Sequence, residues 1–345
     1  MEFDAVIGGV GLRDAQRFAS DVEGTGFSGL WFTEGGRTAY LGCAAAALAS
    51  STLTIGTGVA VAFPRSPMIT AKVAWELADA TAGRFVLGLG TQVKAHVERR
   101  YSAAYDHPGP RLREYVLSLR AIFTSFQTGE PLRYEGEFFR FTIGKLGDAW
   151  SGGPIATPDV PIYLAGVRPW MLQMIGEVAD GLHVHPFHSP RYVAEVVRPN
   201  VELGAMRSDR DLASIALACP VLTIVGDTEE QREHWRRRAR MQIAFYGSTR
   251  TYRGVFELHG WHGVAERLHE LQRAGDVAGM AATITDEMLD AYAVTSSWDD
   301  LADRLVARYQ GLANRLIMYF AGSGWRESRG TIGRWAEVAR AVRAA

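Results

Sequence analysis

The chain has 345 residues, of which 37 are glycine, about 11% against an ordinary usage of about 7%. Its 47% hydrophobic and 22% charged residues are typical of a globular domain and exclude a disordered chain. The glycines follow no G-X-Y period, and a net charge of −1 leaves no basic excess for nucleic acid or an anionic membrane.

Short apolar runs alternate with amphipathic stretches along the chain. Residues 12–25, for example, place Leu12, Ala15, Phe18 and Val22 on one face of a predicted helix. Further helices are predicted near 38–51, 68–82, 111–127, 169–179, 190–206, 228–245 and 330–344. Strands are predicted at 3–8, 29–34, 53–62, 84–90, 161–166, 181–185, 215–226 and 315–322.

These eight strand–helix units predict an α/β fold, a (β/α)8 TIM barrel, as a single domain over residues 1–345. The strand runs are continuously apolar, as expected for parallel strands that are covered on both faces. Two connections are long, one after the fourth strand and one after the seventh. Because loops of this length are usually functional, we expect insertions there that act as lids or interfaces.

The cysteines and the N-terminus bear on the compartment. Cys43 and Cys219 lie far apart in apolar surroundings, which predicts two buried thiols and a reducing, cytoplasmic location. The acidic N-terminal segment lacks the charged start of a signal peptide. Residues 38–64 carry no charge, but their period changes midway, so we expect an alanine-rich helix and a buried strand rather than a membrane span.

In a barrel the active site lies at the mouth, the end where the carboxyl ends of the strands meet. Glycine follows seven of the eight predicted strands within two residues. Such a mouth lets a flat or phosphorylated ligand approach the backbone closely. The carboxylates there are essentially Glu34 and Asp227, and neither has a second acid beside it, which argues against a hydrolase.

Two other features at strand ends have competing interpretations. The turn Ala165-Gly166-Val167-Arg168 opens a predicted helix and would suit a phosphate, although it also fits an ordinary turn. His183, His185 and His188 invite a metal-hydrolase interpretation, but the other strand ends supply no further ligands. We therefore predict no metal site, a packed His183, and a His185 that projects into an organic-ligand pocket.

The arginine-rich stretch near 232–240 is balanced by Glu229, Glu230 and Glu233, which predicts a solvated helix face. His259 and His262 lie in the long seventh connection and are expected at the surface or in a lid.

Four segments together resemble the luciferase-like monooxygenase family, in the branch of oxidoreductases that use the deazaflavin coenzyme F420. They are GFSGLWFTE (26–34), LTIGTGVAVAFPRSPMITAKVAWELADATAGRFVLGLGTQ (53–92), PIYLAGVRPWMLQMIGEVADGLHVHPF (161–187) and VLTIVGDTEEQREHW (221–235). The resemblance covers nearly the whole chain. It implies a (β/α)8 barrel with a flat tricyclic cofactor across its mouth.

The resemblance also implies which residues hold the cofactor. A bulge that backs the ring, often with a non-proline cis peptide, would fall at Gly58–Val59 and continue to Ala60. Gly90, Thr91 and Gln92 would line the ring and its chain, and the turn at 165–168 would receive the phosphate. The full cofactor-binding set is Glu34, Gly58, Val59, Ala60, Gly90, Thr91, Gln92, Ala165, Gly166, Val167 and Arg168.

Two departures from the family's pattern concern proton transfer. Gly35 stands where several relatives have a catalytic histidine, and Val93 stands where some have an acid. We predict Glu34 and His185 as the catalytic residues, with Tyr40 and His96 as further candidates.

The expected reaction is a reversible hydride transfer between F420 and a small organic substrate. A lid from the 95–160 connection would carry aromatic residues such as Tyr101, Tyr105, Phe138 and Phe139. Alternatives are an FMN-dependent monooxygenase and a non-catalytic cofactor-binding protein on the same barrel. Because relatives are often dimers, we expect a homodimer.

Overall fold

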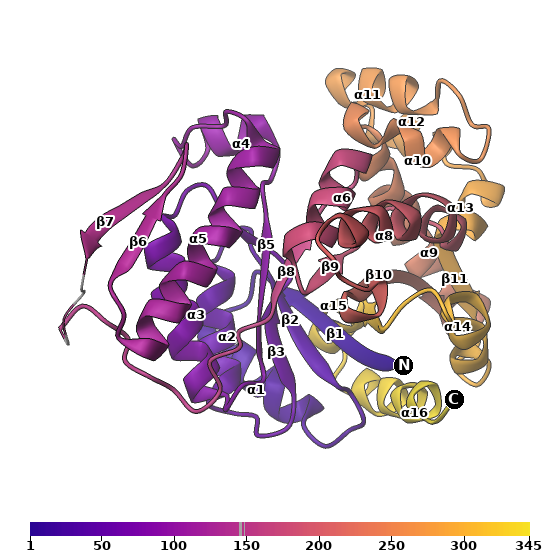
Figure 1. Cartoon of the computed structure of the whole chain (residues 1–345). Helices are drawn as coiled ribbons and strands as arrows, with labels where there is room; N and C mark the ends of the chain where they lie inside the picture. Colours follow the sequence, from indigo (N-terminus) through magenta and orange to yellow (C-terminus); the bar gives the residue numbers. More distant parts are fainter. Residues whose placement is uncertain (145–146, 148) are drawn as a thin grey trace.

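In the computed structural model, which describes residues 1–144, 147 and 149–345, eight parallel strands close into a barrel (Figure 1). β1 pairs with both β2 and β12, and β9 pairs with β10, so the ring has no gap. The predicted (β/α)8 fold is therefore confirmed. The barrel strands are β1 (Glu2–Gly8), β2 (Gly29–Thr33), β3 (Thr54–Thr57), β5 (Phe85–Gly90), β8 (Ile162–Ala165), β9 (Gly181–His183), β10 (Ala216–Val225) and β12 (Arg315–Met318).

Amphipathic helices cover the outside of the barrel because each buries one apolar face. In α1 (Leu12–Val22) the buried residues are Ala15, Phe18, Ala19 and Val22, whereas Leu12, predicted on the same face, is exposed at the start of the helix. The other covering helices are α2 (Ala39–Ala47), α3 (Pro67–Ala80), α5 (Pro108–Thr128), α6 (Pro169–Val178), α7 (Pro190–Tyr192), α8 (Arg198–Arg207), α14 (Leu301–Tyr309) and α16 (Thr331–Ala344).

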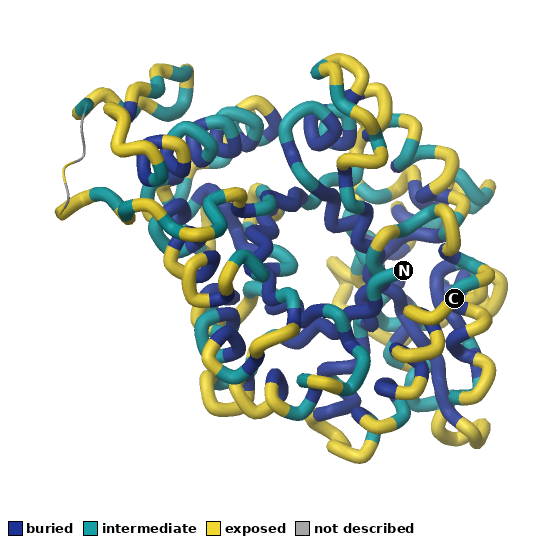
Figure 2. Tube along the Cα trace, turned by 60° about the horizontal axis from the view of Figure 1, so that its bottom comes forward, coloured by how far each residue is buried: buried dark blue, intermediate teal, exposed yellow. Residues whose placement is uncertain are grey.

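Side chains that alternate along the strands fill the barrel interior. Trp31 donates its indole N–H to Asp4 over 2.8 Å, and Arg315 forms an ion pair with the same carboxylate. A hydrophobic cluster in the interior contains Trp31 of β2, Val86 of β5 and Tyr163 of β8. Figure 2 shows the buried strands in dark blue inside a rim of exposed loops. The interior is thus packed.

Both predicted insertions are present. The first contains α4 (Lys94–Arg99) and an antiparallel hairpin of β6 (Leu132–Glu135) and β7 (Arg140–Gly144), which projects to one side (Figure 1). The second forms a helical stack on the other side of the molecule. Its elements are α9 (Glu229–Gly247), a 3-10 turn (Arg250–Tyr252), α10 (Arg253–Glu257), α11 (Val264–Ala274), α12 (Val277–Thr283) and α13 (Asp286–Tyr292).

The structure corrects three details of the predicted strands. β11 (Ala293–Ser296) is a further parallel strand, which pairs with the C-terminal half of β10 and which its short, partly polar sequence concealed. The third strand is interrupted at Gly58–Val59, and its last part is β4 (Ala60–Val61). The eighth strand ends at Met318, because Gly322 belongs to helix α15 (Ala321–Glu327). This helix packs closely on β1, and a Cβ at Gly322 would lie 2.4 Å from the Val6 carbonyl oxygen.

Other predictions concern the thiols and the membrane. Cys43 and Cys219 are buried and free, as predicted. Among the residues that the structure describes, no helix is both long and apolar enough to cross a membrane.

Candidate active site

The floor of the mouth is made of backbone where β3 breaks off. The Gly58–Val59 peptide bond is cis, as predicted. A Cβ at Gly58 would lie 3.2 Å from Trp31 Cβ, and one at Gly90 would lie 2.9 Å from Val59 Cγ2. Two strands therefore meet through glycines, with the Val59 side chain against Gly90 and Ala60 buried behind them. At such glycines a flat ring could approach the backbone closely.

Glu34 holds this floor in place from the end of β2. Its carboxylate accepts a hydrogen bond from the Val61 amide at 2.6 Å and forms an ion pair with Arg65 at 2.5 Å. The Glu34 side chain is only 3% exposed, and the guanidinium of Arg65 also donates to the Val61 carbonyl. Glu34 thus binds the segment that follows the cis peptide and anchors it to the end of β2.

Arg65 also connects Glu34 to two residues of the next helix. It donates to the Thr38 hydroxyl at 3.2 Å, and its guanidinium lies 5.1 Å from the centre of the Tyr40 ring. The Tyr40 hydroxyl is buried and has no hydrogen-bond partner among the described residues. Burial raises the pKa of Tyr40, which disfavours its ionised form.

The turn after β5 has an unusual backbone. Gln92 adopts a left-handed conformation with φ of 57°, which is uncommon for a residue with a side chain. Its carbonyl accepts hydrogen bonds from the Thr91 hydroxyl at 3.0 Å and from the Tyr105 hydroxyl at 3.1 Å. Such conformations cluster at functional sites, and here Tyr105 of the first insertion is fixed beside the mouth.

The turn after β8 leads into the N-terminus of α6. A Cβ at Gly166 would lie 2.8 Å from Ile175 Cδ1, so glycine lets the turn pack on its own helix. The first amides of a helix have no intrahelical acceptor, and Arg168, at the N-cap, has an exposed side chain that makes no capping hydrogen bond. Tyr192 donates to the Val167 carbonyl and fixes the turn. This end of α6 fits a phosphate group.

His185 lies past the end of β9 and takes part in a cluster that the sequence did not predict. Its Nδ1 accepts a hydrogen bond from the Phe187 amide at 3.1 Å. The ring lies 4.6 Å from the centre of the Tyr246 ring and 4.3 Å from that of Tyr252. Burial, with a smaller contribution from His188, lowers the pKa of His185 to about 3, so the ring is neutral near pH 7.

His183, His185 and His188 make different contacts. His183 lies inside the barrel, edge-on to Trp31 at 4.6 Å, and burial lowers its pKa to about 3. His188 contacts the His185 carbonyl and the Tyr309 hydroxyl. Within residues 1–144, 147 and 149–345 no three His, Cys, Asp or Glu side chains gather closely enough to hold a metal ion. The remaining candidate, His96, is half-exposed on α4.

Sequence reasoning missed four residues near the predicted site: Arg65, Tyr246, Tyr252 and Tyr319. Arg65 is 31 positions from Glu34, and no short-range pattern connects the two. Tyr319 could have been found, because period two from the inward-facing Ile317 directs it into the barrel. Tyr246 and Tyr252 belong to the second insertion, whose position over the strands no local pattern indicates.

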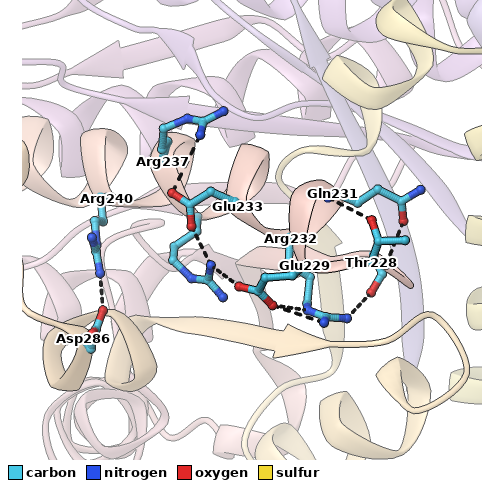
Figure 3. A network of polar contacts seen from close by, with 10 residues as sticks. Thr228, Glu229, Gln231, Arg232, Glu233, Arg237, Arg240 and Asp286 are labelled. Carbon is cyan, nitrogen blue, oxygen red and sulfur yellow. Dashed lines mark hydrogen bonds and ion pairs between the residues drawn. The ribbon is translucent and has the colours of Figure 1, made fainter.

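The arginines of helix α9 are balanced by ion pairs on a partly exposed face, as the sequence predicts, and one of these pairs reaches a neighbouring helix. Arg236 forms ion pairs with Glu229 and Glu233, and Arg240 pairs with Asp286 of α13 (Figure 3). Two adjoining clefts of about 440 and 400 Å³ lie beside this network and share Asp290 and Thr295. Neither cleft is lined by a predicted site residue, so the predicted site is separate from them.

Comparison with known proteins identifies the family. A model of the luciferase-like monooxygenases matches residues 4–315. The chain belongs to this family. It is 40% identical over 309 residues to an uncharacterised Mycobacterium tuberculosis protein, with 90% of each chain covered. It is 29% identical over 293 residues to a 5,10-methylenetetrahydromethanopterin reductase of Archaeoglobus fulgidus, with 82% of each covered.

Solved structures share the fold. The coenzyme F420-dependent tetrahydromethanopterin reductase of Methanopyrus kandleri superposes with a TM-score of 0.81 at 20% identity, over 97% of each chain. The FMN complex of the oxygenating component of 3,6-diketocamphane monooxygenase from Pseudomonas putida gives 0.65 at 14% identity, over 99% of this chain and 96% of that one. Proteins of this fold therefore include one named for F420 and one bound to FMN.

Proposed function

We propose that this protein is an F420-dependent oxidoreductase that transfers a hydride between the deazaflavin and a small organic substrate. The observation that carries the proposal is the pairing of a backbone floor with an anion site at one barrel mouth. Gly58, Val59 and Gly90 would support the ring where two strands pack closely, and the turn at 165–168 would offer backbone amides at a helix N-terminus together with Arg168. A planar ring with a phosphorylated side chain matches both parts.

The relatives favour the deazaflavin over FMN. The A. fulgidus and M. kandleri reductases are the more similar proteins, and the M. kandleri enzyme is named for F420. FMN remains the second candidate, because the P. putida enzyme binds it on the same fold. The non-catalytic alternative draws support from Gly35 and Val93, which replace proton-handling residues expected in the family.

The residues of the chain would have distinct tasks in this reaction. The deazaflavin would supply the hydride chemistry when bound. Gly58, Val59 and Gly90 would support the ring, and Thr91 and Gln92 would line its edge. Glu34, paired with Arg65, would keep the floor in place, and this anchoring role is better supported by its contacts than acid–base catalysis. His185 is the better placed of the two predicted catalytic residues.

A side-by-side titration tests the proposal. We expect purified protein to bind F420 at micromolar concentrations and FMN at least about tenfold more weakly, followed by the change in cofactor absorbance. FMN binding with reaction toward oxygen, and no F420 binding, would establish the monooxygenase instead. A tight F420 complex that turns over no carbonyl or enoyl compound would support the non-catalytic alternative.

A further inference from the structure

Four side chains from separate parts of the chain meet at the mouth beside β9 and β12. They are His185, Tyr246, Tyr252 and Tyr319, which we call the donor cluster. Tyr319 packs against the barrel-interior cluster that contains Trp31, and each member of the donor cluster is only partly buried. The second insertion thus contributes two tyrosines to the site, on the opposite side of the barrel from the floor strands β3 and β5.

His185 is fixed in one tautomer. The Phe187 amide can donate to Nδ1 only if Nδ1 carries a lone pair, so the proton of the neutral ring is on Nε2. Tyr246 and Tyr252 contact the ring and hold its orientation. His185 therefore offers a single N–H donor in a set direction.

The tyrosine pair offers a second donor. The hydroxyls of Tyr246 and Tyr319 lie 2.6 Å apart, and either can donate to the other. In such a pair only one of the two protons is used, so the accepting hydroxyl keeps its own proton for another partner. The pair is neutral near pH 7, because burial raises the pKa of both tyrosines above the ordinary value of 10.

No charged group dominates the surroundings of the cluster in the described part of the chain. The side chains that perturb its members are His188 on His185, Tyr105 on Tyr252, and Gln242 with the other tyrosines on Tyr246. A carboxylate or phosphate on the substrate would find no cation among these neighbours. A carbonyl oxygen, which accepts two hydrogen bonds, would satisfy both neutral donors.

We propose that the donor cluster binds an uncharged ketone or aldehyde by its carbonyl oxygen, with His185 orienting the oxygen and the tyrosine pair supplying the proton. This inference rests on the proposed function for its hydride donor. The deazaflavin, when bound in its reduced form, would supply the hydride to the carbonyl carbon and would itself be oxidised. The oxygen gains a proton from a tyrosine hydroxyl, and the tyrosinate recovers one from water. One C=O π bond becomes one C–H and one O–H bond.

The first test uses protein loaded with reduced F420 and three carbonyl probes: cyclohexanone, pyruvate and glyceraldehyde 3-phosphate. We expect turnover of cyclohexanone only. Tyr319→Phe and Tyr246→Phe should each lower kcat about 100-fold, whereas His185→Phe should mainly raise KM. Tyr134→Phe is the matched control, because its hydroxyl contacts the Glu114 carbonyl in the hairpin insertion.

F420 binding is measured first for each variant, so that loss of the cofactor is separated from loss of the substrate. If F420 binds but a charged probe is reduced in preference to cyclohexanone, the inference is wrong and the proposed function stands. If F420 binds and none of the three probes is reduced, the inference is wrong and the non-catalytic alternative is favoured. Unchanged kinetics in both tyrosine variants would also overturn it. If F420 does not bind at all, the proposed function itself has failed.

A second test does not depend on activity. The ¹⁵N spectrum of the His185 ring, assigned by comparison with His185→Phe, should show a neutral Nε2–H tautomer at pH 7. The rate should be flat between about pH 6 and pH 9, because neither His185 nor the tyrosines that face it titrate there. An Nδ1–H tautomer or an imidazolium at pH 7 would contradict the inference.

Discussion

Glu34 shows how the same residue can be found by pattern and yet take a different role in the fold. Its place after the second strand predicts a cofactor contact or a catalytic acid. In the structure its oxygens accept from Val61 and Arg65, which lie after the strand break. Both oxygens of this buried carboxylate are thus held by protein groups, Oε2 by the Val61 amide and Oε1 by Arg65. The catalytic assignment stays a prediction that the following substitution addresses.

We expect Glu34→Gln to lower the free energy of unfolding by about 2 kcal/mol, because it leaves the half-buried Arg65 without its carboxylate. Urea denaturation measures the change. Glu337→Gln is the control, since its contact with Arg334 is exposed and should contribute less than about 0.5 kcal/mol. Wild-type stability together with lost turnover would instead make Glu34 a catalytic residue.

For single residues, the sequence predicted those whose role is set by the local backbone. It missed those whose role is set by contacts between distant segments. The Gly58–Val59 peptide was identified through the family resemblance, and the structure has it cis. Glu34 and its ion-pair partner Arg65 are 31 positions apart in the sequence. His185 and Tyr252, whose rings are in contact, are 67 positions apart. Only folding brings these segments together.

Among the elements, α6 has the clearest task in the proposed function. Its N-terminus follows a barrel strand and carries Arg168, so the helix dipole and a cation would act on the same phosphate. The sequence predicts the order of strand, glycine turn and helix at this point. The contact of Tyr192 with the turn was not, because it comes from a helix that begins after the next strand.

We expect Arg168→Ala to weaken F420 binding about three- to tenfold and to reduce its dependence on salt, because one cationic contact to the phosphate is lost. Titration at two ionic strengths measures both effects. Arg191→Ala serves as the control, since Arg191 is equally basic but pairs with Glu195 on the surface. Identical affinities in the two variants would mean that the phosphate binds elsewhere.

For the whole molecule, the periodicity of apolar runs was sufficient to predict the barrel but not its additions. Eight buried strands and their helices recur regularly, and each run is long enough to recognise. β11, with four residues, lies between α13 of the second insertion and α14, and pairs with the far half of β10. The hairpin β6–β7 is equally short and mostly exposed, so it carried little apolar signal.

The buried histidines predict how the stability of the fold depends on pH. The pKa of His183, His185 and His188 falls to between about 3 and 4 in the folded chain, below the ordinary 6.5. The unfolded chain therefore binds more protons below pH 6.5, and stability decreases as the pH falls toward 4. From pH 7 to pH 5 we expect a loss of about 1–2 kcal/mol for each histidine. Equal urea midpoints at both pH values would contradict this packing.

The most direct test of the central claim is a crystal structure of the protein with F420. We expect the deazaflavin ring to lie against Gly58, Val59 and Gly90, with its phosphate at the N-terminus of α6 and its free face toward His185 and Tyr319. A cofactor bound away from this floor, for instance in the cleft beside β11, would contradict it.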